Sequence, residues 1–143
     1  MNERYIELKI NDKVYKKRYE IDRFLIKNKL SWFIDVECEN ARIEIIDGTL
    51  VINSAIIYNG IIEFAVIRDA DVRNIKIYNG VIYNGVFKNI IMEKGIIFNG
   101  KFIKYFLGED VEKRGGNFLN EDDNKKDSIK NIVEIEIIPK KLI

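Results

Sequence analysis

The central part of the chain repeats a pattern of small and large apolar residues every five positions. Starting at Gly60, seven of nine positions are small, in the series Gly60, Ala65, Ala70, Ile75, Gly80, Gly85, Ile90, Gly95 and Gly100. Two residues after each one, all nine side chains are large and apolar: Ile62, Ile67, Val72, Ile77, Ile82, Phe87, Met92, Ile97 and Phe102. A period of five fits neither a helix nor a plain strand. It predicts a chain that turns a corner every five residues and points both columns inward.

Asn and Gly support these corners, because both tolerate left-handed backbone angles. Asn precedes the small position at 59, 74, 79, 84, 89 and 99. Over about residues 50–107 the pattern resembles the pentapeptide-repeat family, and Ala70-Asp71-Val72-Arg73-Asn74 fits its motif closely. The resemblance implies a right-handed, four-sided β-helix in which residues twenty apart stack. Tyr58, Tyr78 and Phe98 have that spacing.

An antiparallel β-meander is the alternative for the core. Asn-Gly is also the strongest short signal for a hairpin turn, and residues 95–105 would form one hairpin. The Tyr-x-Gly-x-large pattern also resembles MORN repeats, which form such a meander. However, Asn79-Gly80 and Asn84-Gly85 leave three residues between turns, too few for a useful strand. We therefore favour an all-β protein with a short β-solenoid.

The flanks are expected to close the solenoid within a single domain, because an open coil end exposes core and unpaired strand edges. Residues 1–47 are predicted to form an N-terminal β cap, with a hairpin around Asn11-Asp12 and extended chain over 24–45. After the repeat core at 48–107, the charged segment 108–128 is predicted to be a mobile loop. Residues 129–143 alternate apolar and polar side chains and are predicted to return as a closing strand.

The residue types argue against catalysis. The chain has no His, which excludes a His-based general base, triad or zinc site. Cys38 is the sole cysteine, and its alternation with Ile34 and Val36 predicts a buried thiol. Asp69 and Asp71 could form a carboxylate pair, but we expect a solvated face with neighbouring arginines. The sequence predicts no enzymatic activity, no cofactor and no metal site.

Charge and hydropathy disfavour nucleic acid and membrane as partners. The net charge is +1, and no apolar run reaches the ~20 residues of a membrane span. The basic and aromatic segment 15–19 could touch nucleic acid, but acidic residues follow it and a polar hairpin strand explains it. Some pentapeptide-repeat proteins mimic DNA; here, seven Lys/Arg against four Asp/Glu over 48–107 disfavour such mimicry. A cytoplasmic location is expected, in the host cell if the protein is viral.

The outward positions of the repeat predict a protein-binding face. Its candidate residues are Tyr58, Ile61, Val66, Tyr78, Val81, Tyr83, Val86, Ile91, Ile96 and Phe98. This is too much apolar surface to leave in water, so either the flanks cover it or it takes up a protein partner or further copies of the chain. We expect a non-enzymatic binding module that blocks a host or defence protein, from a virus or mobile element with an AT-rich genome. A structural virion subunit and a nucleic-acid-associated protein are the alternatives.

Overall fold

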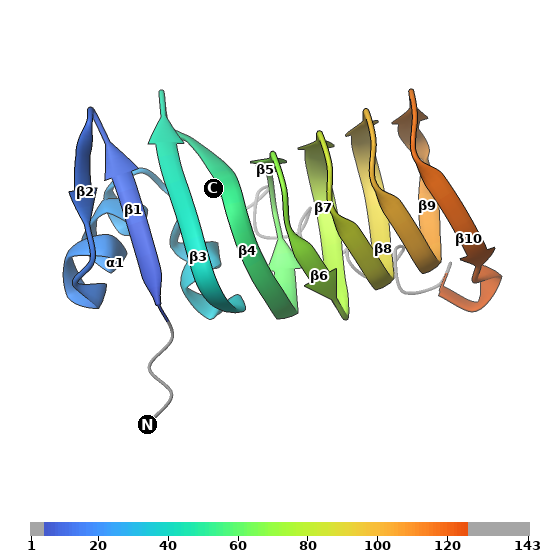
Figure 1. Ribbon diagram of the computed structural model, residues 1–143, viewed down its shortest axis with the longest axis horizontal. Coiled ribbons are helices and arrows are strands. Elements are labelled where there is room, and N and C mark those ends of the chain that lie inside the picture. Colours follow the sequence, from blue (N-terminus) through green and yellow to red (C-terminus); the bar gives the residue numbers. More distant parts are fainter. Residues whose placement is uncertain (1–4, 126–143) are drawn as a thin grey trace, which may run out of the picture.

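The computed structural model describes residues 5–125, which form about five stacked coils of a β-solenoid behind an N-terminal cap (Figure 1). Its helices are α1 (Arg18–Lys27), η1 (Ser31–Asp35) and η2 (Asp123–Lys125). Its strands are β1 (Ile6–Ile10), β2 (Lys13–Tyr15), β3 (Glu37–Ile46), β4 (Thr49–Ile62), β5 (Ala65–Ile67), β6 (Asp71–Arg73), β7 (Ile75–Ile82), β8 (Val86–Ile97), β9 (Lys101–Lys113) and β10 (Asn117–Glu121). The predicted all-β solenoid is confirmed. The predicted closing strand at 129–143 lies outside the described residues.

From Val51 to Leu107 each coil contains fifteen residues, which makes three sides of five. Val66 pairs with Val51 in the coil before it and with Val81 in the coil after it, always in parallel. Hydrogen bonds continue through the corners, as where Tyr83 N–H donates to the Ile67 carbonyl at 2.8 Å. The four-sided coil of twenty residues implied by the family resemblance is therefore wrong. The antiparallel meander is also wrong, because the strands of the repeat core pair in parallel.

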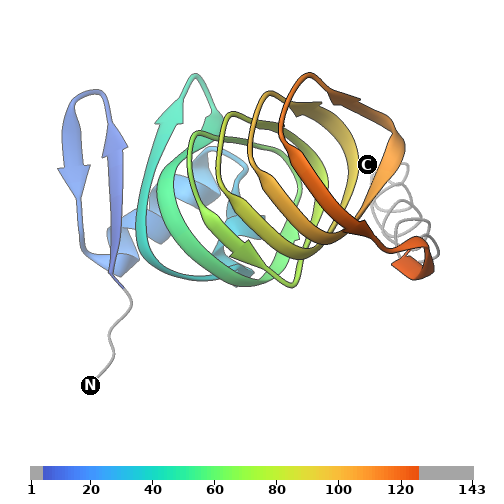
Figure 2. The same cartoon turned by 45° about the vertical axis from the view of Figure 1, so that its right-hand side comes forward.

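The inward positions build one continuous core along the solenoid axis. All nine large positions of the repeat are 0% exposed, as the pattern predicted. Residues fifteen apart stack in columns, and the Phe87 and Phe102 rings lie nearly parallel with centroids 4.7 Å apart. Phe118 continues this column in the next coil, 4.9 Å from Phe102. Figure 2 shows the coils one behind another around this shared interior.

The three corners of a coil differ in the room they leave. At two of them the backbones of successive coils nearly touch, so that a Cβ on Gly85 would lie 2.5 Å from the Ala70 carbonyl oxygen. At the third, the buried side chains of Ile75 and Ile90 fit inside. There the preceding Asn74 adopts the left-handed conformation, with a φ of 55°. We call these the tight corners and the roomy corner.

The N-terminal cap combines a hairpin with two helical segments. β1 and β2 pair around Asn11 and Asp12, whose φ angles of 50° and 68° suit a tight hairpin turn, as predicted. Residues 18–27 and 31–35 are helical, so the extended chain predicted from 24 onward is wrong up to β3. Ile21 and Leu25 lie four apart on α1, a spacing that aligns them on one face, and both are buried in the core.

The cap closes the first coil by direct contact with its backbone. Val36 follows η1 and packs closely against Gly60. If Gly60 carried a Cβ atom, that atom would lie 3.1 Å from the Cα of Val36. Phe33, in η1, is fully buried in the same core as the coils. The helical segments thus cover the end of the interior that stacked strands alone would leave open.

Residues 108–121 of the segment predicted as a charged loop continue the solenoid instead. β9 extends to Lys113, and β10 pairs with it in parallel. The loop was predicted because this segment is rich in charged residues. However, charged side chains can occupy the outward positions of a coil, while Phe118 fills the inward position and stacks on Phe102. A register shift after Met92 adds one residue to this coil, next to Gly108, whose missing Cβ lets the Glu93 backbone approach.

Candidate protein-binding surface

The ten predicted face residues lie on three different sides of the solenoid, because the coil has fifteen residues and not twenty. Five belong to what we call the aromatic side: Val66, Val81, Tyr83, Ile96 and Phe98. Three belong to what we call the Ile91 side: Ile61, Tyr78 and Ile91. Tyr58 and Val86 lie on the third side, which we call the charged side. Any partner would therefore meet these residues as separate surfaces.

The aromatic side carries a stacked pair of rings above an apolar ladder. Val66, Val81 and Ile96 pair in register across successive coils and are half-buried. The rings of Tyr83 and Phe98 stack with centroids 5.0 Å apart and planes 9° apart. Tyr83 keeps 49% of its surface exposed. Because both rings sit on a hydrogen-bonded parallel ladder, they form a preorganised platform.

Arginines stand at both ends of this platform. The guanidinium of Arg114 lies 5.4 Å from the centre of the Phe98 ring. At the other end, Arg68 donates a hydrogen bond to Asn53 Oδ1 at 2.9 Å and lies 3.9 Å from Glu44. More than half of each arginine side chain is exposed. Arg114 also pairs with Glu112, so the platform combines aromatic surface with two exposed arginines that each have a carboxylate neighbour.

A shallow hollow of about 580 Å³ adjoins Tyr83 and Arg68. Ile46, Thr49 and Val51 from the β3–β4 turn line its far wall. Sequence reasoning missed Arg68 and Val51 as members of this surface. Their spacing of fifteen from Tyr83 and Val66 is the signal that would have found them.

The Ile91 side is apolar at its centre and charged along one edge. Ile91 is 6% exposed, with Tyr78 and Phe106 packed against it. The Lys94 ammonium lies 4.9 Å from the centre of the Tyr78 ring. Next to it, burial raises the pKa of the Glu93 carboxyl, Lys94 lowers it and Asp110 raises it further. This edge holds a carboxylate that the fold does not stabilise in its charged form.

The charged side carries the aspartates considered as a catalytic pair. Asp71 Oδ1 makes no hydrogen bond, and Arg73 Nε is 3.6 Å from it. Asp69 is exposed in the turn before β6. Over residues 5–125, no group of three or more His, Cys, Asp or Glu side chains is placed to hold a metal ion.

The remaining candidate residues have structural roles in the cap. Cys38 is a buried thiol, as predicted. The basic and aromatic segment 15–19 divides between β2 and α1. Its Tyr15 ring packs against Phe24, with centroids 4.6 Å apart, and its Arg18 pairs with Asp22 at 3.0 Å.

The fold and its surface together define a β-solenoid with apolar columns on its outer sides. Comparison with protein-family models, curated proteins and solved structures found no significant match. Across the part of the chain that the structure describes, no helix has the length and apolarity needed to cross a membrane.

Proposed function

We propose that this protein is a non-enzymatic binding module that takes up a partner protein on its aromatic side. The observation that carries the proposal is the exposed Tyr83, stacked on Phe98 and held by a rigid ladder. Aromatic residues and arginine are enriched where protein interfaces bind most strongly. A rigid platform loses little side-chain entropy on binding.

The arginines at the two ends of the platform define the chemistry of the partner. Arg68 and Arg114 keep more than half of their side chains exposed. Glu44 and Glu112 each occupy only part of a guanidinium, so a partner that places an apolar group on the rings and carboxylates at the exposed guanidinium edges would use both features. We therefore propose an acidic protein surface as the partner of the aromatic side.

The test is an affinity capture with the full chain and two variants. The double variant Tyr83→Ser/Phe98→Ser removes the platform, and Lys88→Ser on the charged side serves as a matched control. A protein retained by the wild type and the control but lost from the double variant supports the proposal. If every captured protein is retained by the double variant, the aromatic side is not the binding surface.

Two biological roles remain proposals and differ in oligomeric state. A module that blocks a host or defence protein, with a viral or mobile-element origin, would be a monomer that binds its target. A structural virion subunit would form a defined oligomer or filament. Size-exclusion chromatography with light scattering separates these outcomes, and loss of an oligomer in the Tyr83→Ser/Phe98→Ser variant would assign the aromatic side to self-association.

A further inference from the structure

The Ile91 side differs from the aromatic side in that its central residue is covered. In β8, Ile91 lies between the inward-facing Ile90 and Met92, and it belongs to an apolar cluster separate from the core. It is nevertheless only 6% exposed, whereas Ile61, two coils earlier in the same column, is 37% exposed. Tyr78 and Phe106 pack against Ile91, so the apolar surface that this side leaves open to another segment is the exposed Ile61 and the outer faces of these two half-buried rings.

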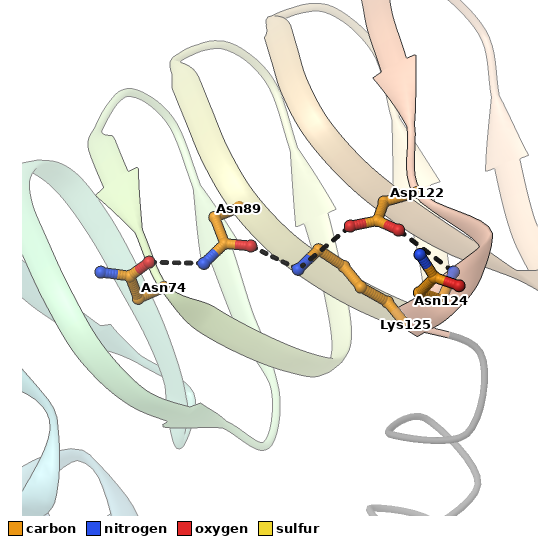
Figure 3. A network of polar contacts seen from close by, with 5 residues as sticks. All are labelled: Asn74, Asn89, Asp122, Asn124 and Lys125. Atoms are coloured by element: carbon orange, nitrogen blue, oxygen red, sulfur yellow. Dashed lines mark hydrogen bonds and ion pairs between the residues drawn. The ribbon is translucent and has the colours of Figure 1, made fainter.

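The described chain ends at the edge of this side, where a network of polar contacts holds it (Figure 3). The Lys125 ammonium donates a hydrogen bond to Asn89 Oδ1 and lies 3.8 Å from Asp122 Oδ2. Asn89 Nδ2 in turn donates to Asn74 Oδ1 at 2.6 Å. Only 17% of the Lys125 side chain is exposed. The described chain therefore ends at the roomy corner, beside the Ile91 side.

A hollow of about 360 Å³ joins this anchor to the apolar centre of the side. Lys125 and Asn124 line one part of it, and Lys76 and Ile91 line the other. A chain that continues past Lys125 therefore has an open path towards Ile91.

We propose that residues 126–143 of the same chain dock along the Ile91 side. Eighteen residues follow Lys125, and an extended chain of that length reaches ~60 Å. Coils stack ~4.8 Å apart, so the column from Phe106 back to Ile61 needs only ~15 Å of that reach. Val133, Ile135 and Ile137 alternate with Glu134 and Glu136. In an extended conformation the apolar set would cover Ile61 and the Tyr78 and Phe106 rings that pack on Ile91, and would leave the glutamates in water.

The anchor is the reason to assign this surface to the protein's own chain. A segment tethered at Lys125 has an effective concentration in the millimolar range at the neighbouring surface. A separate molecule would have to displace it. The proposal does not depend on the partner proposed for the aromatic side, which lies on another side of the coil.

Paramagnetic NMR on the full chain tests the docking. A nitroxide is attached to the cysteine of a Glu136→Cys variant. Cys38 is replaced by alanine in the same chain, so that the nitroxide has a single attachment site. The readout is the broadening of the isoleucine methyl signals. We expect the strongest broadening at Ile91 and Ile61, and clearly weaker broadening at Ile96 on the aromatic side. Absent broadening, or broadening equal on the two sides, would overturn the proposal.

Two further samples separate docking from its alternatives. The added substitution Ile135→Asp should remove the broadening at Ile91, while Glu134→Gln, on the other set of the alternation, should leave it. Unchanged broadening in the Ile135→Asp sample would contradict the proposed contact. Mixing spin-labelled chains without isotopes with isotope-labelled chains without a nitroxide should produce no broadening. If it does, the occupant is a second copy and the intramolecular proposal is wrong.

Discussion

The tight corners and the roomy corner of the solenoid make the same turn with different residues. At the tight corners Gly85, Gly95 and Gly100 themselves adopt positive φ angles between 130° and 142°. At the roomy corner Asn74 and Asn89 adopt the left-handed conformation one position earlier. The next residue is then free to carry a side chain, and Ile75 and Ile90 fill the interior there.

This difference shows that glycine is needed at a corner residue that both adopts a positive φ and lies against the backbone of the preceding coil. Where Asn makes the turn, the same column holds a large apolar residue and the corner adds to the core. The fifteen-residue coil thus has two corners set by backbone approach and one set by side-chain packing. Substitutions at the two kinds of corner test that division.

Gly95→Val should prevent cooperative folding. A Cβ on Gly95 would overlap the carbonyl oxygen of Gly80, and the φ of 130° is strained for any L side chain. Overpacking and backbone strain together should cost about 4 kcal/mol or more. Denaturant unfolding followed by circular dichroism should therefore show no cooperative transition for this variant. The control is Gly48→Ala, also at positive φ but with nothing within 4 Å of its Cβ, which should cost about 1 kcal/mol.

Ile90→Ala should destabilise the roomy corner by creating a cavity. Ile90 is 0% exposed, and truncating a buried isoleucine costs about 2–5 kcal/mol. The exposed Ile46→Ala serves as the control and should stay within about 0.5 kcal/mol of the wild type. A loss below that limit for Ile90→Ala would mean that this corner does not depend on side-chain packing.

The five-residue repeat could be predicted because a large apolar residue stands at every fifth position from Ile62 to Phe102. The number of residues in one coil could not be predicted from this repeat alone. Fifteen and twenty are both multiples of five, so either coil keeps every inward residue inward. The distinguishing signal is the order at the small positions, where Ile75, Gly80 and Gly85 are followed by Ile90, Gly95 and Gly100. Two isoleucines fifteen residues apart, each followed by two glycines, indicate three corners per coil.

The candidate surface was predictable in part for the same reason. The frame shows which residues point outward, but their grouping into sides depends on the coil length. Tyr83 and Phe98 are fifteen apart and stack, whereas Tyr58 and Tyr78 are twenty apart and lie on different sides. The α1 helix was missed because two buried residues, Ile21 and Leu25, carry its apolar face in a short segment read as extended.

Asn89→Ala should cost about 1–2 kcal/mol, less than the core change. Alanine loses the hydrogen bonds of Asn89 to Asn74 and Lys125 and is strained at a φ of 55°. Asn89→Gly also loses both hydrogen bonds but accepts the backbone angle, so it should cost less. Thermal unfolding of the two variants measures the difference. Equal losses would show that the left-handed backbone at this corner is not what selects Asn.

Glu93→Gln should have the smallest effect, and the effect should depend on pH. Burial raises the pKa of this carboxyl above its ordinary value of 4.5, so the folded state favours the protonated form. Its contribution to stability is present below the ordinary pKa and is lost as the pH rises through the raised pKa. Glutamine should therefore raise the melting temperature at pH 7 but not at about pH 3.5. The exposed Glu109→Gln is the control, and an equal shift at both pH values would exclude titration as the cause.

The fifteen-residue register also determines how such a chain can change its length. A duplication of fifteen residues within β7 and β8 would place every inward residue in its existing column and repeat the order of corners. A duplication of five or ten residues would keep the large apolar residues pointing inward. It would, however, place an isoleucine at a tight corner, against the backbone of the neighbouring coil. Genetic rearrangements that survive selection should therefore add or remove whole coils, and related chains should differ in length by multiples of fifteen.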